Sequence, residues 1–416
     1  MDVMNFLNEV TSRYPEAISF GPGRPYEGLF EVERIGYYLD AYTRHLSEDL
    51  GRTPDEVRTL LFQYGRTNGQ IHELVARALH NDEGIETDPE SLVVTVGCQE
   101  GMFLTLRALF RDPSDVLLVS SPCYVGITGA ARLLDIETVH VPEGERGADP
   151  EALRRTVAAL RAEGKRPRAL YVVPDFSNPT GTCLPLPTRH QLLSMAEEED
   201  LLLLEDNPYG FFTRTGTGLP TLKALDRRRR VIYLGSFAKT CFPGARVGYV
   251  VADQLVQAAD GSRTFLADEL SKIKGMVTVN TPALSQAVIG GMLLTHDFRL
   301  RAANKPAADF YQQNLAVLLD SLDRLLPAER REAAGISWNA PEGGFFLTLT
   351  LPVPADNALL ERSAREHGVI WTPMRCFYPD DGGGRSQMRL SLSYLTPEHI
   401  AEGARRLAGL LEECCV

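Results

Sequence analysis

The chain reads Ser236-Phe237-Ala238-Lys239-Thr240-Cys241-Phe242-Pro243-Gly244-Ala245-Arg246-Val247-Gly248 between two apolar runs, Val231–Leu234 and Val247–Val251. A lysine at the end of a strand is usually a solvated residue at the rim of a sheet. Here a serine stands three residues before the lysine and an arginine stands seven residues after it. Because these three side chains can share one anion, the stretch predicts a ligand-binding turn, with a surface strand-turn-strand as the plainer alternative.

Short apolar runs alternate with helix-like stretches from about residue 91 to residue 251. Helical spacing of apolar residues occurs over Met102–Phe110, Pro150–Ala162 and Thr188–Glu199. This alternation predicts an α/β fold with a mostly parallel central sheet covered by helices on both faces. In such a sheet, ligands gather at the carboxyl ends of the strands. The apolar runs are Leu92–Val96, Val116–Ser120, Thr138–Val141, Ala169–Val173, Leu201–Glu205, Val231–Leu234 and Val247–Val251.

After residue 254 the pattern becomes mainly helical and then mixed. A long helical stretch over about Asp297–Leu326 is expected to link two units. We expect a large α/β domain over residues 45–300 and a smaller α+β domain formed from residues 1–44 and 301–416. The later strands and helices are expected at Ile336–Trp338, Phe345–Thr350, Ala355–Glu366, Val369–Thr372, Met388–Leu392 and Pro397–Glu413.

The composition is that of an ordinary globular enzyme, with 44% hydrophobic and 24% charged residues. The net charge of −12 opposes attraction to nucleic acid and to anionic membranes, so neither is expected as a partner. The start, Met1–Phe6, lacks the basic and apolar segments of a signal peptide, which favours the cytoplasm. The chain has 7 cysteines, and no Cys/His group has the spacing of zinc ligands, so no metal is expected.

Polar and aromatic side chains follow the ends of several predicted strands. Gly97-Cys98-Gln99 joins a strand to a helix, where free backbone amides can bind an anion. Tyr124 can stack on a flat ring, and Asn178 lies in the turn sequence Asn-Pro-Thr-Gly. Asp206 and Tyr209 follow the next strand along the chain. Each feature also has a plainer interpretation: a common strand-glycine-helix turn, a core aromatic residue, a reverse turn or a helix cap.

Taken together and in chain order, these motifs resemble those of fold-type I, pyridoxal-phosphate-dependent aminotransferases of class I/II. The resemblance covers roughly residues 16–410 and is best to the kynurenine and α-aminoadipate aminotransferase kind. It implies that Lys239 binds pyridoxal 5′-phosphate as a Schiff base and acts as general acid and base. It also implies that Asp206 pairs with the pyridine nitrogen, that Asn178 and Tyr209 contact the phenolic oxygen, and that Tyr124 stacks on the ring.

The same resemblance assigns the remaining contacts of cofactor and substrate. Cys98, Gln99, Ser236 and Arg246 would bind the phosphate, although Cys98 and Ala238 replace hydroxyl residues that are usual in the family. Tyr64 matches a tyrosine that reaches the phosphate of a neighbouring subunit, which implies a homodimer with shared active sites. Arg389 matches the arginine that binds the α-carboxylate of the substrate, beside Asn178.

The stretches Met4–Leu7 and Ile18–Pro25 are also similar to antibiotic-pathway transaminases of the dihydroxyphenylglycine type. The resemblance therefore implies transfer of an amino group between an L-amino acid, aromatic or non-proteinogenic, and a 2-oxo acid. Arg24 and Arg375 are expected either near the entrance of the site, favouring an acidic or phenolic substrate, or on the surface.

Two other functions share these residues and stay open at this stage. One is a different pyridoxal-phosphate reaction, such as elimination, cyclisation or oxidation of an amino acid. The other is a non-catalytic effector module, like that attached to certain transcription regulators. This acidic chain shows no basic segment for a DNA-binding domain, which makes the second less favoured.

Overall fold

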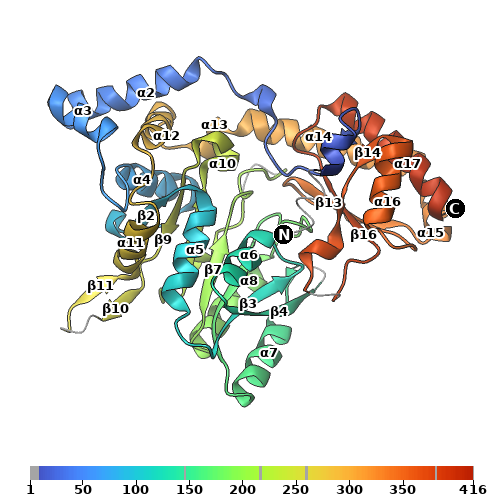
Figure 1. Ribbon diagram of the computed structural model, residues 1–416, viewed down its shortest axis with the longest axis horizontal. Helices are drawn as coiled ribbons and strands as arrows, with labels where there is room; N and C mark the ends of the chain where they lie inside the picture. The colour runs from blue at the N-terminus through green and yellow to red at the C-terminus, as the bar shows by residue number, and fades with distance from the viewer. Residues whose placement is uncertain (1–8, 145–146, 215–217, 258–260, 380–381, 416) are drawn as a thin grey trace.

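The computed structural model describes residues 9–144, 147–214, 218–257, 261–379 and 382–415, so the stretch Met4–Leu7 lies outside the described residues. Its central sheet has 8 strands in the order β2-β9-β8-β7-β6-β3-β4-β5 (Figure 1). Neighbours from β4 through β3, β6 and β7 to β8 are parallel, whereas β9 is antiparallel to both β8 and β2, and β5 is antiparallel to β4. The predicted, mostly parallel sheet is confirmed. The strands are β2 Leu92–Thr95, β3 Asp115–Ser121, β4 Glu137–Gly144, β5 Gly147–Ala148, β6 Arg166–Val172, β7 Leu202–Asp206, β8 Val231–Ser236 and β9 Gly248–Val251.

Helices cover both faces of this sheet because successive side chains of each strand point to opposite faces. In β3, Val116 and Leu118 are in one apolar cluster with residues of α7 and α8, and Leu117 and Val119 are in another with residues of α5 and α6. Nearly continuous apolar runs are what a sheet buried on both faces requires. The helices of this part are α2 Arg34–Arg44, α3 Pro54–Phe62, α4 His72–Glu83, α5 Gly97–Leu109, α6 Val125–Leu133, α7 Pro150–Ala162, α8 Leu186–Glu198, α9 Leu222–Leu225, α10 Phe237–Thr240, α11 Leu266–Val277 and α12 Ala283–Thr295, with a hairpin of β10 Leu255–Gln257 and β11 Arg263–Phe265.

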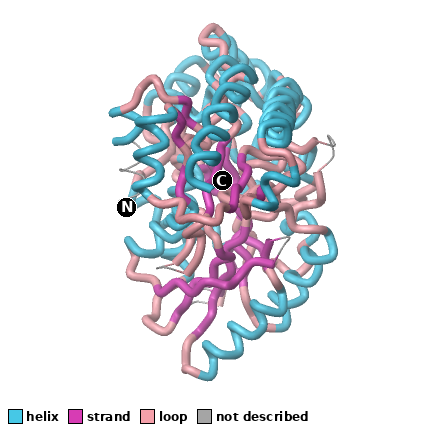
Figure 2. Tube along the Cα trace, turned by 90° about the vertical axis from the view of Figure 1, so that its right-hand side faces the viewer, coloured by secondary structure: helices cyan, strands magenta, loops and turns pink. Residues whose placement is uncertain are grey.

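A second, antiparallel sheet has the strand order β12-β13-β16-β15 (Figure 1). A separate parallel pair, β1 Ile18–Ser19 with β14 Val369–Ile370, brings the N-terminal segment beside the C-terminal part of the chain. In Figure 2 the strands run through the middle of the molecule, with helices outside them. The remaining elements are α13 Leu300–Ala303, α14 Lys305–Leu325, α15 Ala328–Ala333, β12 Ser337–Trp338, β13 Phe346–Thr350, α16 Asn357–Arg362, β15 Thr372–Pro373, β16 Gln387–Ser391 and α17 Pro397–Cys415.

The structure refines two expectations about the chain between and around the sheets. The expected single helix over 297–326 is divided into α13 and α14 at Asn304, two residues before Pro306, whose ring and missing N–H favour the start of a new helix. Helix α2 packs on α12 so closely that a Cβ on Gly291 would lie 1.7 Å from the carbonyl oxygen of Tyr38. The domain division at residue 45 stays a prediction, and α2 lies on the side of the larger sheet (Figure 1).

None of the helices in the described part of the chain combines the length and the apolar character that crossing a membrane requires.

Candidate active site

One cavity, of about 390 Å³, lies at the carboxyl ends of the parallel strands. Parallel strands place their carboxyl ends at one edge of the sheet, so residues that are distant in sequence meet there. β7 supplies Asp206 and β8 ends at Ser236, while the turn after β2 and the loop after β6 supply Cys98, Gln99 and Asn178. The remaining residues come from the segments after β3, β7 and β8 and from β16 of the second sheet. The cavity brings together ten of the predicted site residues: Cys98, Gln99, Tyr124, Asn178, Asp206, Tyr209, Ser236, Lys239, Arg246 and Arg389.

Lys239 enters the cavity from the short helix α10. The hydroxyl of Ser236 caps this helix by accepting the Ala238 amide at 3.2 Å. The Nζ atom of Lys239 donates a hydrogen bond to the carbonyl oxygen of Gly23 at 2.7 Å. Burial, helped by the positive charges of Arg246 and Arg389, lowers the pKa of Lys239 to about 8, and the negative charge of Asp206 opposes this shift. The amine is therefore far more nucleophilic at neutral pH than an exposed lysine.

Site-resolved labelling with an amine-selective reagent should reveal this lowered pKa. Only the neutral amine reacts, so the labelling rate of Lys239 should rise with pH and level off above about pH 8. Lys272, whose pKa is raised by its hydrogen bond with Glu269, is the internal control and should still be gaining reactivity at pH 10. Peptide mass spectrometry of the cofactor-free protein gives both rates. Parallel pH profiles for the two lysines would contradict the assigned environment.

Asp206 is the buried last residue of β7, and both of its carboxylate oxygens have hydrogen-bond donors. The Tyr171 hydroxyl donates to Oδ2 at 2.6 Å, and the Cys98 thiol donates to Oδ1 at 3.7 Å. Burial raises the pKa of Asp206 to about 6, while the two donors and the charge of Lys239 oppose that rise. The thiol of Cys98 is therefore directed at this carboxylate, whereas the sequence analysis considered it as a phosphate contact.

Sequence reasoning missed Tyr171. Its signal was slight: a tyrosine within the apolar run Ala169–Val173, where a core aromatic residue is the ordinary interpretation. Only the pairing of β6 with β7, which sets Tyr171 opposite Leu204, brings its hydroxyl to the end of the neighbouring strand.

The turn between β2 and α5 lies against the guanidinium of Arg246. Gly97 has a φ of 72°, and a Cβ there would lie 2.3 Å from Nη2 of Arg246, so glycine lets the guanidinium approach the backbone. Arg246 itself has a φ of 51°, a conformation that costs energy for a residue with a side chain. The first amides of α5, at Cys98 and Gln99, lack partners within the helix. Together they form a site suited to an anion.

Arg389 lies at the other end of the cavity, on β16, and is only 6% exposed. Its Nη1 donates to Oδ1 of Asn178 at 2.7 Å and its Nη2 donates to the carbonyl oxygen of Gly21 at 2.6 Å. Its guanidinium carbon lies over the rings of Phe346 and Phe377, 4.5 and 5.0 Å from their centroids. Burial lowers its pKa to about 10. Within the described residues its Nε is buried with no hydrogen-bond partner, which is a donor available to a ligand.

Three residues from the sequence analysis lie elsewhere. Tyr64 is 83% exposed and does not line the cavity. Arg24 stacks on the ring of Tyr394 at 3.9 Å and faces Glu27; it lines a neighbouring groove and not the cavity. Arg375 is exposed and also does not line the cavity. Arg24 shares the neighbouring groove with Lys239, but neither Arg24 nor Arg375 lines the cavity that holds Arg389, so a substrate-binding role for either stays a prediction.

Comparisons with known proteins agree with this geometry. The family described as aminotransferase class I and II matches residues 52–407. The (S)-3,5-dihydroxyphenylglycine transaminase of Amycolatopsis orientalis is 52% identical over 410 residues, covering 98% of this chain and 91% of that protein. The 2-aminoadipate transaminase of Thermus thermophilus is 33% identical over 416 residues, covering 98% and 92%.

A solved structure of Pyrococcus horikoshii kynurenine aminotransferase superimposes with a TM-score of 0.83 at 28% identity, covering 99% of this chain and 94% of that one. The match spans both sheets and every element that lines the cavity. The family resemblance and the fold inferred from the sequence are thereby confirmed. The chain belongs to the class I and II aminotransferases and is a pyridoxal-phosphate-dependent aminotransferase.

Proposed function

We propose that this aminotransferase uses an aromatic L-amino acid of the phenylglycine type as amino donor and a 2-oxo acid as acceptor. The 52% identity to a dihydroxyphenylglycine transaminase supports the donor class. The observation that carries the proposal is the charge of the cavity wall. Its cations among the described residues are Lys239, Arg246 and Arg389, and its one anion is Asp206.

Each of these charges is assigned to the cofactor or to the α-carboxylate of the substrate. The uncharged residues of the cavity wall therefore determine which donor side chain fits. A dicarboxylic donor such as 2-aminoadipate would need a further cation for its second carboxylate, because burying an unpaired charge is costly. The wall instead offers aromatic and apolar surface from Phe377 and Ile370, with neutral polar groups from Gln99 and Ser19. An aromatic ring with hydroxyl substituents matches both kinds of surface.

A half-reaction screen tests this proposal. The holoenzyme is mixed with single amino acids in the absence of oxo acid, and the change in cofactor absorbance is followed with the oxo acid and ammonia released. Phenylglycine-type and other aromatic donors should react at least about tenfold faster than 2-aminoadipate, the ratio that one lost charge-assisted contact gives. A faster reaction with 2-aminoadipate would refute the donor class, and release of ammonia would favour elimination or oxidation over transfer.

The cavity residues fit pyridoxal phosphate. We propose that Lys239 binds its aldehyde carbon, that Asp206 pairs with its pyridine nitrogen, and that Asn178 and Tyr209 contact its phenolic oxygen. The phosphate would be held by Arg246, Ser236 and the amides of Cys98 and Gln99, with Tyr124 against the ring. The donor set agrees with this assignment: a buried amine of lowered pKa, a buried carboxylate and an arginine beside free helix amides occur in one cavity.

The cofactor, when bound, supplies a positively charged ring that withdraws electrons from the α carbon of the amino acid. The protein residues then divide the remaining tasks. Arg389 holds the α-carboxylate in two-pronged contact and orients the Cα–H bond toward Lys239. The substrate's amino group would replace Lys239 on the aldehyde carbon, and the released Nζ, as a neutral amine, would then accept the proton from the α carbon. Asp206, kept ionised by Tyr171 and Cys98, holds the ring nitrogen in its protonated form.

Replacing Tyr171 with phenylalanine should weaken cofactor binding most on the acidic side. Loss of the hydroxyl donor raises the pKa of Asp206 above about 6, so a larger fraction of the carboxylate is protonated and uncharged at pH 6. We expect cofactor affinity to fall about tenfold or more at pH 6 and less at pH 9, where Asp206 is ionised in both proteins. Equilibrium titration of the apoprotein measures this. An equal loss at both pH values would indicate a packing effect instead.

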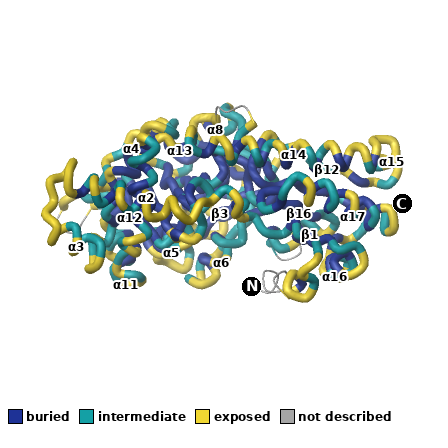
Figure 3. The backbone as a smooth tube through the Cα atoms, turned by 90° about the horizontal axis from the view of Figure 1, so that it is seen from above, coloured by how far each residue is buried: buried dark blue, intermediate teal, exposed yellow. Residues whose placement is uncertain are grey.

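We also propose that the enzyme is a homodimer, in agreement with the prediction from Tyr64. Helices α2, α3, α11 and α12 lie at one end of the molecule (Figure 3), and large apolar side chains of these helices and of the residues next to them are exposed. Exposed apolar surface of this extent is typical of an interface, and α2 and α3 both pack on α12 (Figure 1). The exposed residues are Val32, Ile35 and Tyr37 around α2, Phe62 and Tyr64 at the end of α3, Met276, Val277 and Val279 at the end of α11, and Leu284 on α12.

A charge placed on this surface should separate the subunits. The double variant Val32→Glu/Met276→Glu alters side chains that are 78% and 88% exposed in the single chain, so its fold should be retained. We expect the wild type to sediment as a dimer and the variant as a monomer. Leu133→Glu, at a residue 73% exposed on α6, is the matched control and should remain dimeric. A monomeric wild type would overturn the proposal. The cytoplasmic location stays a prediction.

A further inference from the structure

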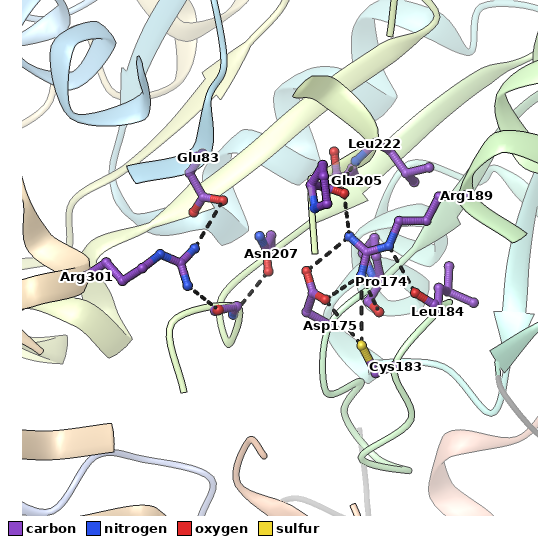
Figure 4. Close-up of polar contacts among 12 residues, drawn as sticks. Glu83, Pro174, Asp175, Cys183, Leu184, Arg189, Glu205, Asn207, Leu222 and Arg301 are labelled. Carbon is purple, nitrogen blue, oxygen red and sulfur yellow. Dashed lines mark hydrogen bonds and ion pairs between the residues drawn. The ribbon is translucent and has the colours of Figure 1, made fainter. Parts of the chain in front are cut away.

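A fully buried arginine lies behind the cavity, in contact with two loops and not with the cavity itself. Arg189 is in α8 and is 0% exposed. Its Nε donates to the carbonyl oxygen of Leu184 at 3.0 Å, and its Nη1 donates to that of Pro220 at 2.9 Å. Its Nη2 donates to the carboxylate of Asp175, to which Nη1 also approaches at 3.4 Å (Figure 4).

These contacts join the two ends of the loop that carries Asn178. Asp175 begins the loop and Leu184 ends it, and the Leu184 amide donates to the carbonyl oxygen of Pro174 at 2.8 Å. Inside the loop, Gly181 N donates to Ser177 O at 2.7 Å. The loop is thus closed at its base by Arg189, and its tip presents Asn178 to Arg389 at 2.7 Å.

The same arginine is joined to the strand end that carries Asp206. Pro220, which accepts from Arg189, lies just before Leu222 and Lys223, whose amides donate to the carboxylate of Glu205 at 2.8 and 2.7 Å. Glu205 is 0% exposed and immediately precedes Asp206 in β7. The guanidinium of Arg189 therefore connects the loop that carries Asn178 with the segment that binds the end of β7 (Figure 4).

Stability alone does not explain such a residue. Burying an ion pair costs enough that replacement by apolar residues of similar size is often neutral or stabilising. A planar guanidinium with five donors can instead hold several acceptors in fixed directions, which an apolar side chain cannot do. Here the acceptors come from two separate segments: Asp175 and Leu184 belong to the loop after β6, and Pro220 precedes α9.

We infer that Arg189 is a positioning residue of the aminotransferase. It holds the 174–184 loop so that the amide of Asn178 stays against Arg389 and the phenolic oxygen of the cofactor. This inference rests on the proposed function of Asn178 and Arg389. It assigns Arg189 no contact with substrate, so its effect must pass through the loop.

The test restores the stability of the protein without restoring the hydrogen bonds by which Arg189 positions the loop. The two effects can then be measured separately. Arg189→Met leaves Asp175 buried without its partner, so the melting temperature should fall and KM for the amino donor should rise. Arg189→Met/Asp175→Leu removes both charges and should recover the melting temperature. We expect KM of the double variant to remain raised by about 10- to 100-fold, the factor for one lost hydrogen bond to a charged group. The pH midpoint of the bound cofactor's absorbance change should also stay shifted.

Two further variants complete the design. Arg189→Lys keeps the buried charge but cannot reach Leu184 and Pro220 together, so it should stay folded with a raised KM and a shifted midpoint. Arg154→Met, which removes an exposed arginine paired with Glu198 of α8 at 3.2 Å, should leave all three measurements unchanged. A double or lysine variant with wild-type melting temperature, KM and midpoint would show that Arg189 is only structural. Failure of the proposed function would appear earlier, as a wild type that forms no oxo acid in the screen.

Discussion

Replacing Lys239 with alanine is expected to abolish the covalent attachment of pyridoxal phosphate and to reduce turnover by at least about 10²- to 10⁴-fold, the contribution of one acid–base group. Lys239 is the only lysine among the described residues that line the cavity. Its pKa of about 8 gives it enough neutral amine at pH 7 to 8 to bind the aldehyde and to accept a proton. Both tasks end when the amine is removed.

Borohydride reduction followed by peptide mass spectrometry measures the attachment directly, and single-turnover absorbance measures the activity. The wild type should carry the reduced cofactor on the peptide that contains Lys239, and the variant should carry none. Lys272→Ala, at a lysine whose side chain is 71% exposed, is the control and should behave as the wild type. Attachment of the cofactor to another lysine in the active wild type would overturn the assignment of position 239.

Asp206→Asn should lower kcat/KM by about 30- to 5,000-fold, which corresponds to the roughly 2–5 kcal/mol lost when one partner of a buried charge pair is removed. Asparagine has nearly the same shape but no charge, so the packing around Tyr171 and Cys98 is kept. Without the carboxylate, the pyridine nitrogen loses its protonation and the ring withdraws electrons less effectively. The effect should fall mainly on the proton-transfer step.

A deuterium-labelled α carbon makes this expectation measurable, because slower proton removal increases the isotope effect on the half-reaction. Asp200→Asn is the matched control: Asp200 lies just before β7, its side chain is 81% exposed, and it pairs with Arg230. The control should keep wild-type rates. A variant at position 206 with an unchanged rate and isotope effect would remove Asp206 from its proposed place at the ring nitrogen.

Much of the fold and of the site could be predicted from the sequence because its signals are local. The strand runs Leu201–Glu205 and Val231–Leu234 correspond to β7 and β8 within one or two residues. Asp206 and Ser236 stand at the ends of those strands, and Asn178 lies in a turn that follows β6. Each of these positions follows from a strand, a turn and the rule that parallel strands end together.

Other features could not be predicted from the sequence, because they depend on which strands are neighbours and on the directions in which side chains point. The Tyr171 hydroxyl reaches Asp206 only because β6 pairs with β7. Cys98 faces the same carboxylate because α5 begins beside β9, where a Cβ on Gly248 would lie 2.5 Å from the Cys98 amide nitrogen. Arg24 stacks on Tyr394, far along the chain, and this contact draws it away from the cavity.

By itself the sequence determined the α/β architecture and the strand-end positions of Lys239, Asp206 and Asn178, since apolar periodicity and turn residues act over a few residues of chain. The chemistry followed from the resemblance of the ordered motifs to a known family. Tertiary structure alone decided the hydrogen-bond donors to Asp206, the neutral wall beside Arg389 and the role inferred for Arg189. The physical reason is that hydrogen bonds and burial depend on distances between residues far apart in the chain, and packing sets those distances.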